Sequence, residues 1–119
     1  MTKIAEFDDT KFRRGIILFN SGEFFKAHEV WEELWLVAAE HDKMFLQGLI
    51  QLAAAFHHDS RGNREGTKSL LEAALKKLKK YPDKFRGVNL NTLRGAANAW
   101  LAILATGEIA APITLPRIE

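Results

Sequence analysis

One stretch of this chain, residues 19–35, constrains its fold more than any other, and its sequence is FNSGEFFKAHEVWEELW. An Asn-Ser-Gly turn is followed by apolar residues that recur every three or four positions, as along one face of an α-helix. Those residues are Phe24, Ala27, Trp31, Leu34, Trp35 and Ala38. His28 lies about 60° from the centre of this apolar face, and Glu32, one turn later, lies at its edge. A titratable pair spaced i, i+4 is therefore expected at the margin of the core.

Helical spacing continues through the rest of the chain and predicts four further helices. The five expected ranges are about 8–19, 23–40, 42–58, 65–81 and 91–107, with Asp42 as the N-cap of the third. The third is apolar almost all round, which is typical of a helix at the centre of a bundle. Its remaining narrow strip holds Gln47, Gly48, Gln51, Ala54, Ala55 and His58.

The predicted fold class is therefore all-α, with no strand. Residues 1–119 are expected to form a single domain, a bundle of about five helices over residues 8–107 with a central antiparallel hairpin. Residues 82–91 are expected to be a loop. Residues 108–119 contain two prolines and are expected to form an extended tail that packs through Ile113 and Leu115.

Composition excludes several classes of site. The chain has no cysteine, which excludes disulfides, thiol nucleophiles and cysteine-ligated zinc. The first residues, MTKIAEFDD, lack the apolar run of a secretory signal, and no apolar segment is long and uniform enough to span a bilayer. We therefore expect a cytoplasmic protein with no membrane partner.

Charge is distributed unevenly along the chain, although the net charge is only +2. Residues 1–60 carry 6 Lys/Arg against 10 Asp/Glu, and residues 61–119 carry 11 against 5. Such a division indicates either a polyanion-binding face or two halves that attract each other. The second interpretation is the simpler one for a single domain.

Three segments together carry a recognisable pattern: F-N-x-G-x-F-F-x-A-H-E-x-W-E-x-x-W, then F-x-Q-G-L-I-Q-L-A-A-A-F-x-H, then R-G-N. In this order and spacing they resemble the small all-helical family catalogued as domain of unknown function 309, over roughly residues 19–78 with weaker agreement to residue 93. The resemblance implies a compact helical bundle and no particular activity. His57 stands where an aromatic such as tyrosine is expected, so His58 is the better match. The pattern picks out Asn20, Gly22, His28, Glu29, Glu32, Trp35, Gln47, Gly48, Gln51, His58, Gly62 and Asn63.

The candidate site is a polar cluster on the second and third helices. Its members are His28, Glu29, Glu32, Trp35, Gln47, Gln51 and His58. An antiparallel hairpin would bring His28 towards residues 54–58. The cluster has three interpretations: a polar network that holds the fold, a pocket for a small molecule or peptide, and a metal or catalytic site. His28, Glu32 and His58 are the metal candidates, but neither Glu-x-x-His nor His-Glu-x-x-His is present.

Two further sets of residues complete the predictions. Asn20, Gly22, Gly62 and Asn63 are expected to shape turns. Lys76, Lys77, Lys79, Lys80, Lys84 and Arg86 form a basic segment, either a solvated helix end or a surface for nucleic acid or another polyanion.

The first choice of function is a non-catalytic binding or scaffold module that uses the His/Glu cluster. A metal-dependent, hydrolase-like enzyme and a polyanion binder are the alternatives. No cofactor is expected, and the partner, a protein or a small molecule, is not readable from the sequence. Homo-oligomerisation is left open.

Overall fold

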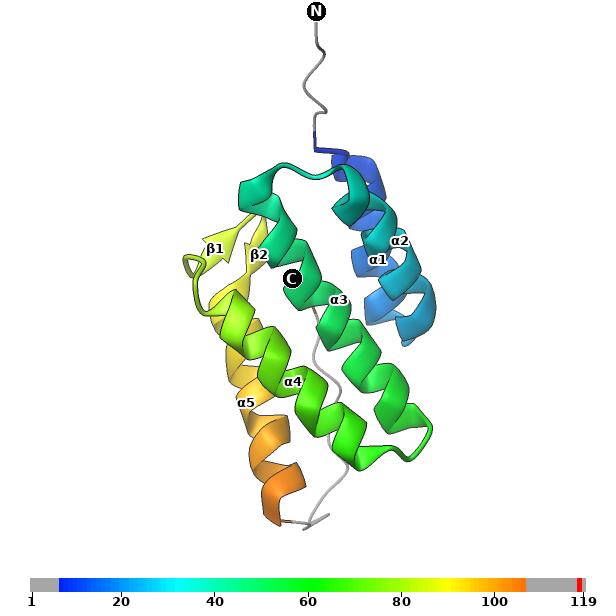
Figure 1. Cartoon of the computed structure of the whole chain (residues 1–119), viewed down its shortest axis with the longest axis vertical. Coiled ribbons are helices and arrows are strands. Elements are labelled where there is room, and N and C mark those ends of the chain that lie inside the picture. Colours follow the sequence, from blue (N-terminus) through cyan, green and yellow to red (C-terminus); the bar gives the residue numbers. More distant parts are fainter. Residues whose placement is uncertain (1–6, 107–117, 119) are drawn as a thin grey trace, which may run out of the picture.

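The helices of the chain follow one another in an up-and-down order (Figure 1). The computed structural model describes residues 7–106 and 118. Within them lie five helices: α1 (Asp9–Asn20), α2 (Phe24–Val37), α3 (Glu40–Ser60), α4 (Arg64–Leu78) and α5 (Leu90–Thr106). A short antiparallel hairpin, β1 (Lys84–Phe85) and β2 (Val88–Asn89), joins α4 to α5. The predicted all-α bundle is confirmed.

The central helix is α3, which runs between α2 on one side and α4 on the other (Figure 1). Ten of its residues are buried, among them Phe45 and Phe56. Gly48, which the sequence placed on the polar strip, is buried too. A Cβ at Gly48 would lie 2.8 Å from Leu78 Cδ2 and 3.6 Å from the Ala74 carbonyl oxygen, so α3 and α4 pack closely there. Ala55 is likewise buried, and the exposed part of the strip is correspondingly narrower.

Trp31 fixes α2 against α1. Its side chain is fully buried, and its Nε1 donates a hydrogen bond to the Phe12 carbonyl oxygen at 3.2 Å. Gly15 lies directly against the indole ring, where a Cβ would overlap it. The Asn20–Gly22 turn then reverses the chain, with Gly22 at φ +81° as expected for its position. This packing determines which side of α2 faces outwards.

Two predictions near helix ends are wrong: Asp42 as an N-cap, and residues 82–91 as a loop without strands. Helix α2 ends at Val37 and α3 begins at Glu40, so Asp42 lies inside the first turn of α3 and is not its N-cap. The predicted loop 82–91 contains the hairpin, in which Phe85 pairs with Val88. Helix α5 begins at Leu90, where the Asn89 side chain accepts a hydrogen bond from the Thr92 amide at 3.1 Å.

The expected tail is described at one residue only. Ile118 is buried, and its amide and carbonyl both bond to the Asn20 carboxamide, at 2.8 Å and 2.9 Å. Asn20, predicted to shape a turn, therefore also holds a residue 98 positions away. The predictions for Gly107, Ile113 and Leu115 lie outside the described residues. No helix in the described ranges is both long and apolar enough to cross a membrane.

Candidate functional site

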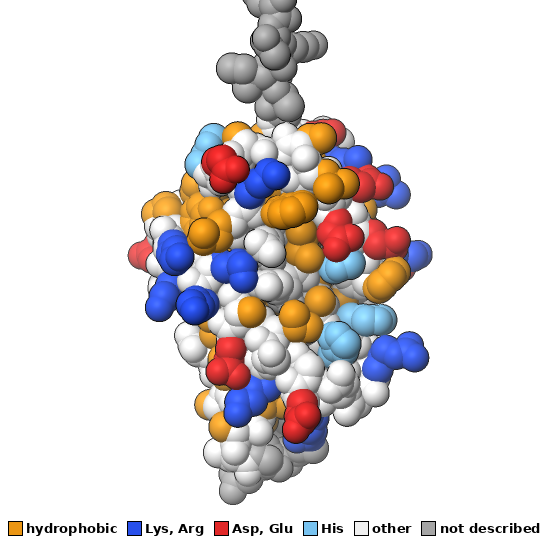
Figure 2. Space-filling model, in the orientation of Figure 1, with side chains coloured by type: hydrophobic (Ala, Val, Ile, Leu, Met, Phe, Trp, Pro, Cys, Tyr) orange, Lys and Arg blue, Asp and Glu red, His pale blue; other side chains and the backbone are white. Residues whose placement is uncertain are grey.

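A small hollow lies where the beginning of α2 meets the end of α3. It encloses about 130 Å³ and is lined by Phe25, His28, Ala54, His57 and His58. The antiparallel arrangement of α2 and α3 brings these residues together, in the register expected for His28. Figure 2 shows His side chains grouped over this part of the molecule, below several Asp and Glu side chains.

Phe25 is the exposed apolar group of the hollow. Its side chain is 52% exposed. The ring is stacked on His28, with centroids 5.7 Å apart and planes at 26°, and its centroid is 5.3 Å from that of His57. An exposed aromatic ring beside a concave site is typical of a binding surface.

The His28–Glu32 pair forms as predicted but lies nearer to solvent than expected. His28 Nε2 is 3.1 Å from Glu32 Oε1, with the His28 side chain 23% and the Glu32 side chain 54% exposed. Because the carboxylate accepts from Nε2, the neutral ring carries its lone pair on Nδ1. Nδ1 is buried and has no hydrogen-bond partner among the described residues. The network that would hold the fold is therefore incomplete at His28.

His58 is oriented by the N-cap of α4. Asn63 Oδ1 accepts from the Gly66 amide at 3.0 Å, which leaves Asn63 Nδ2 to donate to His58 Nδ1 at 3.1 Å. His58 Nε2 is then the nitrogen that carries the proton. Gly62, at φ +77°, allows the turn that brings Asn63 to this position. The turn thus determines where α4 begins. It also determines that His58, which lines the hollow, carries its proton on Nε2.

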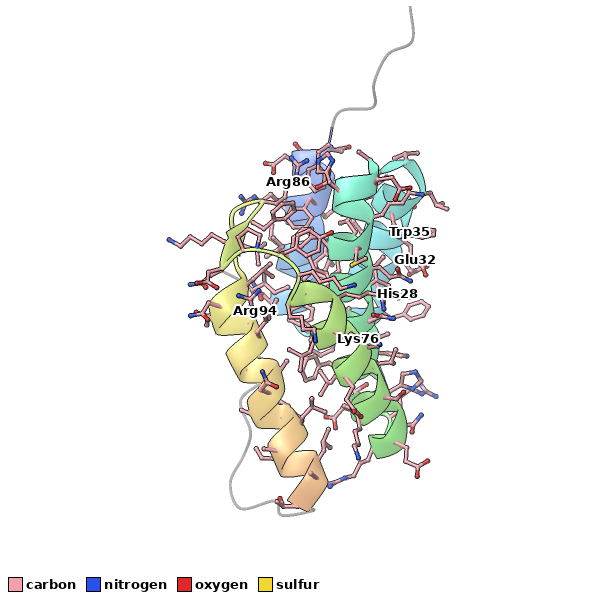
Figure 3. The ribbon with its side chains drawn as sticks, turned by 60° about the vertical axis from the view of Figure 1, so that its left-hand side comes forward. His28, Glu32, Trp35, Lys76, Arg86 and Arg94 are labelled. Atoms are coloured by element: carbon pink, nitrogen blue, oxygen red, sulfur yellow. The ribbon has the colours of Figure 1, made fainter. Side chains whose placement is uncertain are left out.

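Four other predicted members lie outside the hollow. Glu29 and Gln47 are exposed. Trp35 follows Glu32 along α2 (Figure 3), and the Lys43 ammonium lies 4.7 Å from the centroid of its ring. Trp35 Nε1 and Gln51 Oε1 are buried without a hydrogen-bond partner in the described part of the chain. The predicted cluster is therefore spread along the α2–α3 face, with only His28 and His58 at the hollow.

The metal alternative lacks a ligand set in the described ranges. No three His, Asp or Glu side chains there are close enough together to hold a metal ion. His28 is paired with Glu32, whereas His58 is bonded to Asn63.

Sequence reasoning missed Phe25, Ala54 and His57. Phe25 lies off the apolar face of α2, and an aromatic residue in such a position was a usable signal. His57 was set aside because it departs from the family pattern, yet it contacts Phe25. Ala54 carries no chemical signal of its own, since it only leaves room for the hollow.

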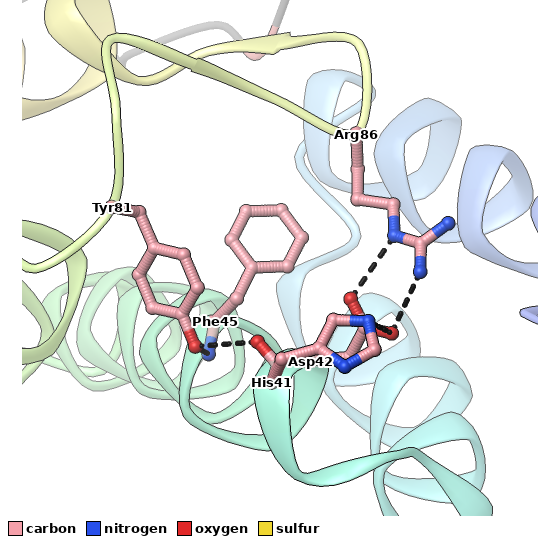
Figure 4. Close-up of polar contacts among 5 residues, drawn as sticks. All are labelled: His41, Asp42, Phe45, Tyr81 and Arg86. Atoms are coloured by element: carbon pink, nitrogen blue, oxygen red, sulfur yellow. Dashed lines mark hydrogen bonds and ion pairs between the residues drawn. The ribbon is translucent and has the colours of Figure 1, made fainter.

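A second polar cluster joins the hairpin turn to the start of α3 (Figure 4). Asp42 is 2% exposed and accepts two hydrogen bonds from Arg86, at 3.0 Å and 2.7 Å, while His41 Nε2 lies 3.2 Å from its carboxylate. The Tyr81 hydroxyl accepts from the Phe45 amide and donates to the His41 carbonyl oxygen, both at 2.9 Å. Burial raises the pKa of Tyr81 above its usual value, the Phe45 amide opposes the rise, and the Asp42 charge adds to it.

The residues of the predicted basic segment have different surroundings in the structure. Arg86 is bound to Asp42 and so differs from the five lysines. Lys76, Lys77, Lys79 and Lys80 lie at the end of α4, and Figure 2 shows Lys and Arg side chains gathered over this end and the hairpin. These four lysines form no ion pair with the described part of the chain. The basic side chains over α4 and the hairpin thus lie on the opposite flank of the molecule from the histidines that line the hollow.

Comparison with known proteins agrees with the resemblance seen in the motifs. Residues 12–70 match the family described as Domain of unknown function (DUF309). The matched segment, just under half of the chain, belongs to this family. The DUF309 match begins earlier and ends earlier than the motifs indicated, and it includes every residue that lines the hollow. The basic end of α4 lies beyond it.

A longer relative contains a segment similar to this DUF309 chain. An uncharacterized protein of Aquifex aeolicus (strain VF5) is 37% identical over 95 residues, which cover 79% of this chain. The same alignment covers 28% of that relative, so the chain spans under a third of its length.

Proposed function

We propose that this chain is a non-catalytic binding module that docks a segment of a partner protein on the face formed by α2 and α3. The observation that supports this most is Phe25, which is more than half exposed and packs against two histidines at the edge of a hollow. A cytosolic location, which suits a chain without cysteine, is part of the proposal.

The size of the hollow favours a protein segment over a free small molecule. Sites for drug-sized ligands usually enclose roughly 300–1,000 Å³. At about 130 Å³ this hollow accommodates one side chain of a partner. The surface around it then has to supply the rest of the contact.

The outer side of α2 indicates the chemistry of that segment. Phe25 and Leu36 are eleven positions apart, three helical turns, and so lie on the same side of α2. Leu36 is 69% exposed, and Glu29 and Glu32 lie between the two. A complementary segment places an apolar side chain at each end and a Lys or Arg opposite the carboxylates.

The longer relative supports a modular role. In that relative, the similar segment makes up 28% of the chain, and the rest is additional sequence. Binding modules are commonly joined to further domains, whose position or activity they direct.

The proposal is tested by ¹H–¹⁵N NMR titration with two side-chain analogues, 4-methylphenol for the apolar anchor and n-butylammonium for lysine. We expect 4-methylphenol to shift the amide signals of residues 25, 28, 54, 57 and 58, and n-butylammonium those near Glu29 and Glu32. Phe25→Ala should abolish the 4-methylphenol shifts. The control is Ile17→Ala, which removes an apolar side chain that is 65% exposed on α1, and it should keep them. Shifts that are absent, or that survive in Phe25→Ala, contradict the proposal.

A further inference from the structure

A separate groove runs between α4 and α5 on the other side of the molecule from the histidines. It encloses about 370 Å³ and is open along its length. From α4 it takes residues 72, 75, 76 and 79, which are spaced as one helix face, and from α5 residues 94, 98 and 101, which are spaced likewise. Figure 3 shows Lys76 and Arg94 on the two facing helices.

The groove has an apolar floor and a basic rim. Leu75 and Leu101 are partly buried against the core and partly open to the groove. Lys76 and Lys79 are exposed at its edge and have no ion pair among residues 7–106 and 118. Two cations without an ion pair among the described residues, beside two partly buried leucines, form a surface whose complement is both acidic and aliphatic.

Arg94 holds the groove in shape. Its guanidinium donates to the carbonyl oxygens of Leu78 and Tyr81, both at 3.0 Å, and to Asp83 Oδ1 at 2.7 Å. These bonds close the C-terminal end of α4 and anchor it to α5. The rim lysines are therefore presented by a braced pair of helices.

We propose that the α4–α5 groove binds an acidic peptide segment of a partner protein, with aliphatic side chains on the leucine floor and carboxylates on Lys76 and Lys79. The observations favour such a peptide over nucleic acid. No lining residue is aromatic, so bases have no stacking platform in the groove. The open shape also favours a peptide over a small molecule, because a small ligand would stay largely exposed.

The experiment is selection of random 12-residue peptides displayed on phage against the full chain, followed by fluorescence anisotropy with the enriched peptides. We expect enriched sequences that combine Asp or Glu with Leu, Ile or Val. The double variant Lys76→Glu/Lys79→Glu should bind them about tenfold more weakly or worse, and Lys76→Gln/Lys79→Gln should show a smaller loss. The control Arg61→Glu/Arg64→Glu changes the net charge equally at the far end of α4 and should bind within about twofold of the original chain.

Several outcomes overturn this proposal. The proposal is wrong if the enriched peptides lack acidic residues or if no peptide is enriched. It is also wrong if the lysine variants bind the enriched peptides as tightly as the original chain does. Tighter binding of a 12-nucleotide single strand than of any peptide would assign the groove to nucleic acid. Concentration-dependent self-association in sedimentation, lost in the lysine variants, would assign it to a second copy of the chain. Phe25→Ala should leave peptide binding at the groove intact, which separates this test from that of the α2–α3 face.

Discussion

A single buried carboxylate, Asp42, connects parts of the chain that are far apart in sequence. It lies in the first turn of α3 and accepts both hydrogen bonds of the Arg86 guanidinium, which comes from the hairpin turn 44 residues later. Arg86 has φ +51°, an uncommon backbone conformation for a residue with a side chain. Its guanidinium also lies 4.0 Å from the centroid of the Phe7 ring. The ion pair therefore holds the hairpin in a conformation that its own sequence does not favour.

Removing the arginine should be costly. We expect Arg86→Ala to lower the free energy of unfolding by about 3–5 kcal/mol, because the buried Asp42 carboxylate loses both guanidinium hydrogen bonds and keeps only the exposed His41 ring beside it. Lys84→Ala removes a neighbouring cation that is exposed on the same hairpin and should change stability by less than about 0.5 kcal/mol. Urea unfolding of the two variants gives the comparison. Equal, small effects would show that the Asp42–Arg86 pair does not hold the hairpin.

A second prediction concerns the pKa of Tyr81. Its pKa is raised from 10.0, mainly by burial, so the folded state keeps the phenolic proton at a pH where the unfolded chain has lost it. The contribution of Tyr81 to the free energy of unfolding is complete below pH 10. It is lost as the pH rises through the higher pKa that Tyr81 has in the folded chain. Tyr81 is the chain's one tyrosine, so absorbance at 295 nm during an alkaline titration reports it alone. We expect a midpoint above 10 in buffer and near 10 in concentrated urea; identical midpoints would contradict the burial.

At the scale of elements, the contact between α3 and α4 depends on the absence of a side chain at Gly48. Gly48→Ala would place a methyl group 2.8 Å from Leu78 Cδ2 and 2.9 Å from Leu78 Cγ, inside the core. We expect it to destabilise the fold by about 1–3 kcal/mol through overpacking.

Gly95 in α5 is the matched control for this change. Among the described residues, no atom of a packing neighbour lies within 4 Å of a Cβ built there. Alanine is also the better helix former, so Gly95→Ala should stabilise the fold by about 0.5–1 kcal/mol. Thermal and urea unfolding of both variants measure the difference. Effects of the same sign would mean that helix propensity, and not the α3–α4 contact, governs Gly48.

The elements also show what sequence reasoning can and cannot reach. Apolar periodicity located all five helices and made α3 central, because local spacing determines which side of a helix is buried. It misplaced Asp42, because a carboxylate near a helix start has the same pattern whether it caps the helix or pairs with a distant arginine. It missed the hairpin, since strands of two residues leave no alternation to detect. At the site it found His28 and His58 but missed Phe25, whose role depends on what α3 places beside it.

Over the whole molecule, the charged side chains are mixed but not evenly spread. Histidines and several carboxylates gather over α2 and α3, where Lys11 and Lys26 pair with Glu33 and Glu23, and other Lys and Arg side chains gather over the end of α4 and the hairpin (Figure 2). The sequence alone favoured mutual attraction of the two halves. In the structure only part of the charge is used in this way, by Arg86 with Asp42, and the four lysines at the end of α4 form no ion pair with the described residues. The two proposed docking surfaces would let one chain bring two partners together.

If the α2–α3 face is kept for binding and is not required for folding, Phe25→Glu should remove binding and leave the fold intact. Phe25 is the second residue of α2, whose first turn has no acidic residue and whose N-cap, Glu23, makes no capping hydrogen bond with its side chain, which pairs with Lys26. A glutamate there gains about 0.3–1 kcal/mol from the helix dipole, which offsets the loss of the exposed ring contacts. We predict a free energy of unfolding within about 1 kcal/mol of the original chain, together with loss of the 4-methylphenol shifts. A larger loss of stability would show that Phe25 holds the fold and would contradict the binding role.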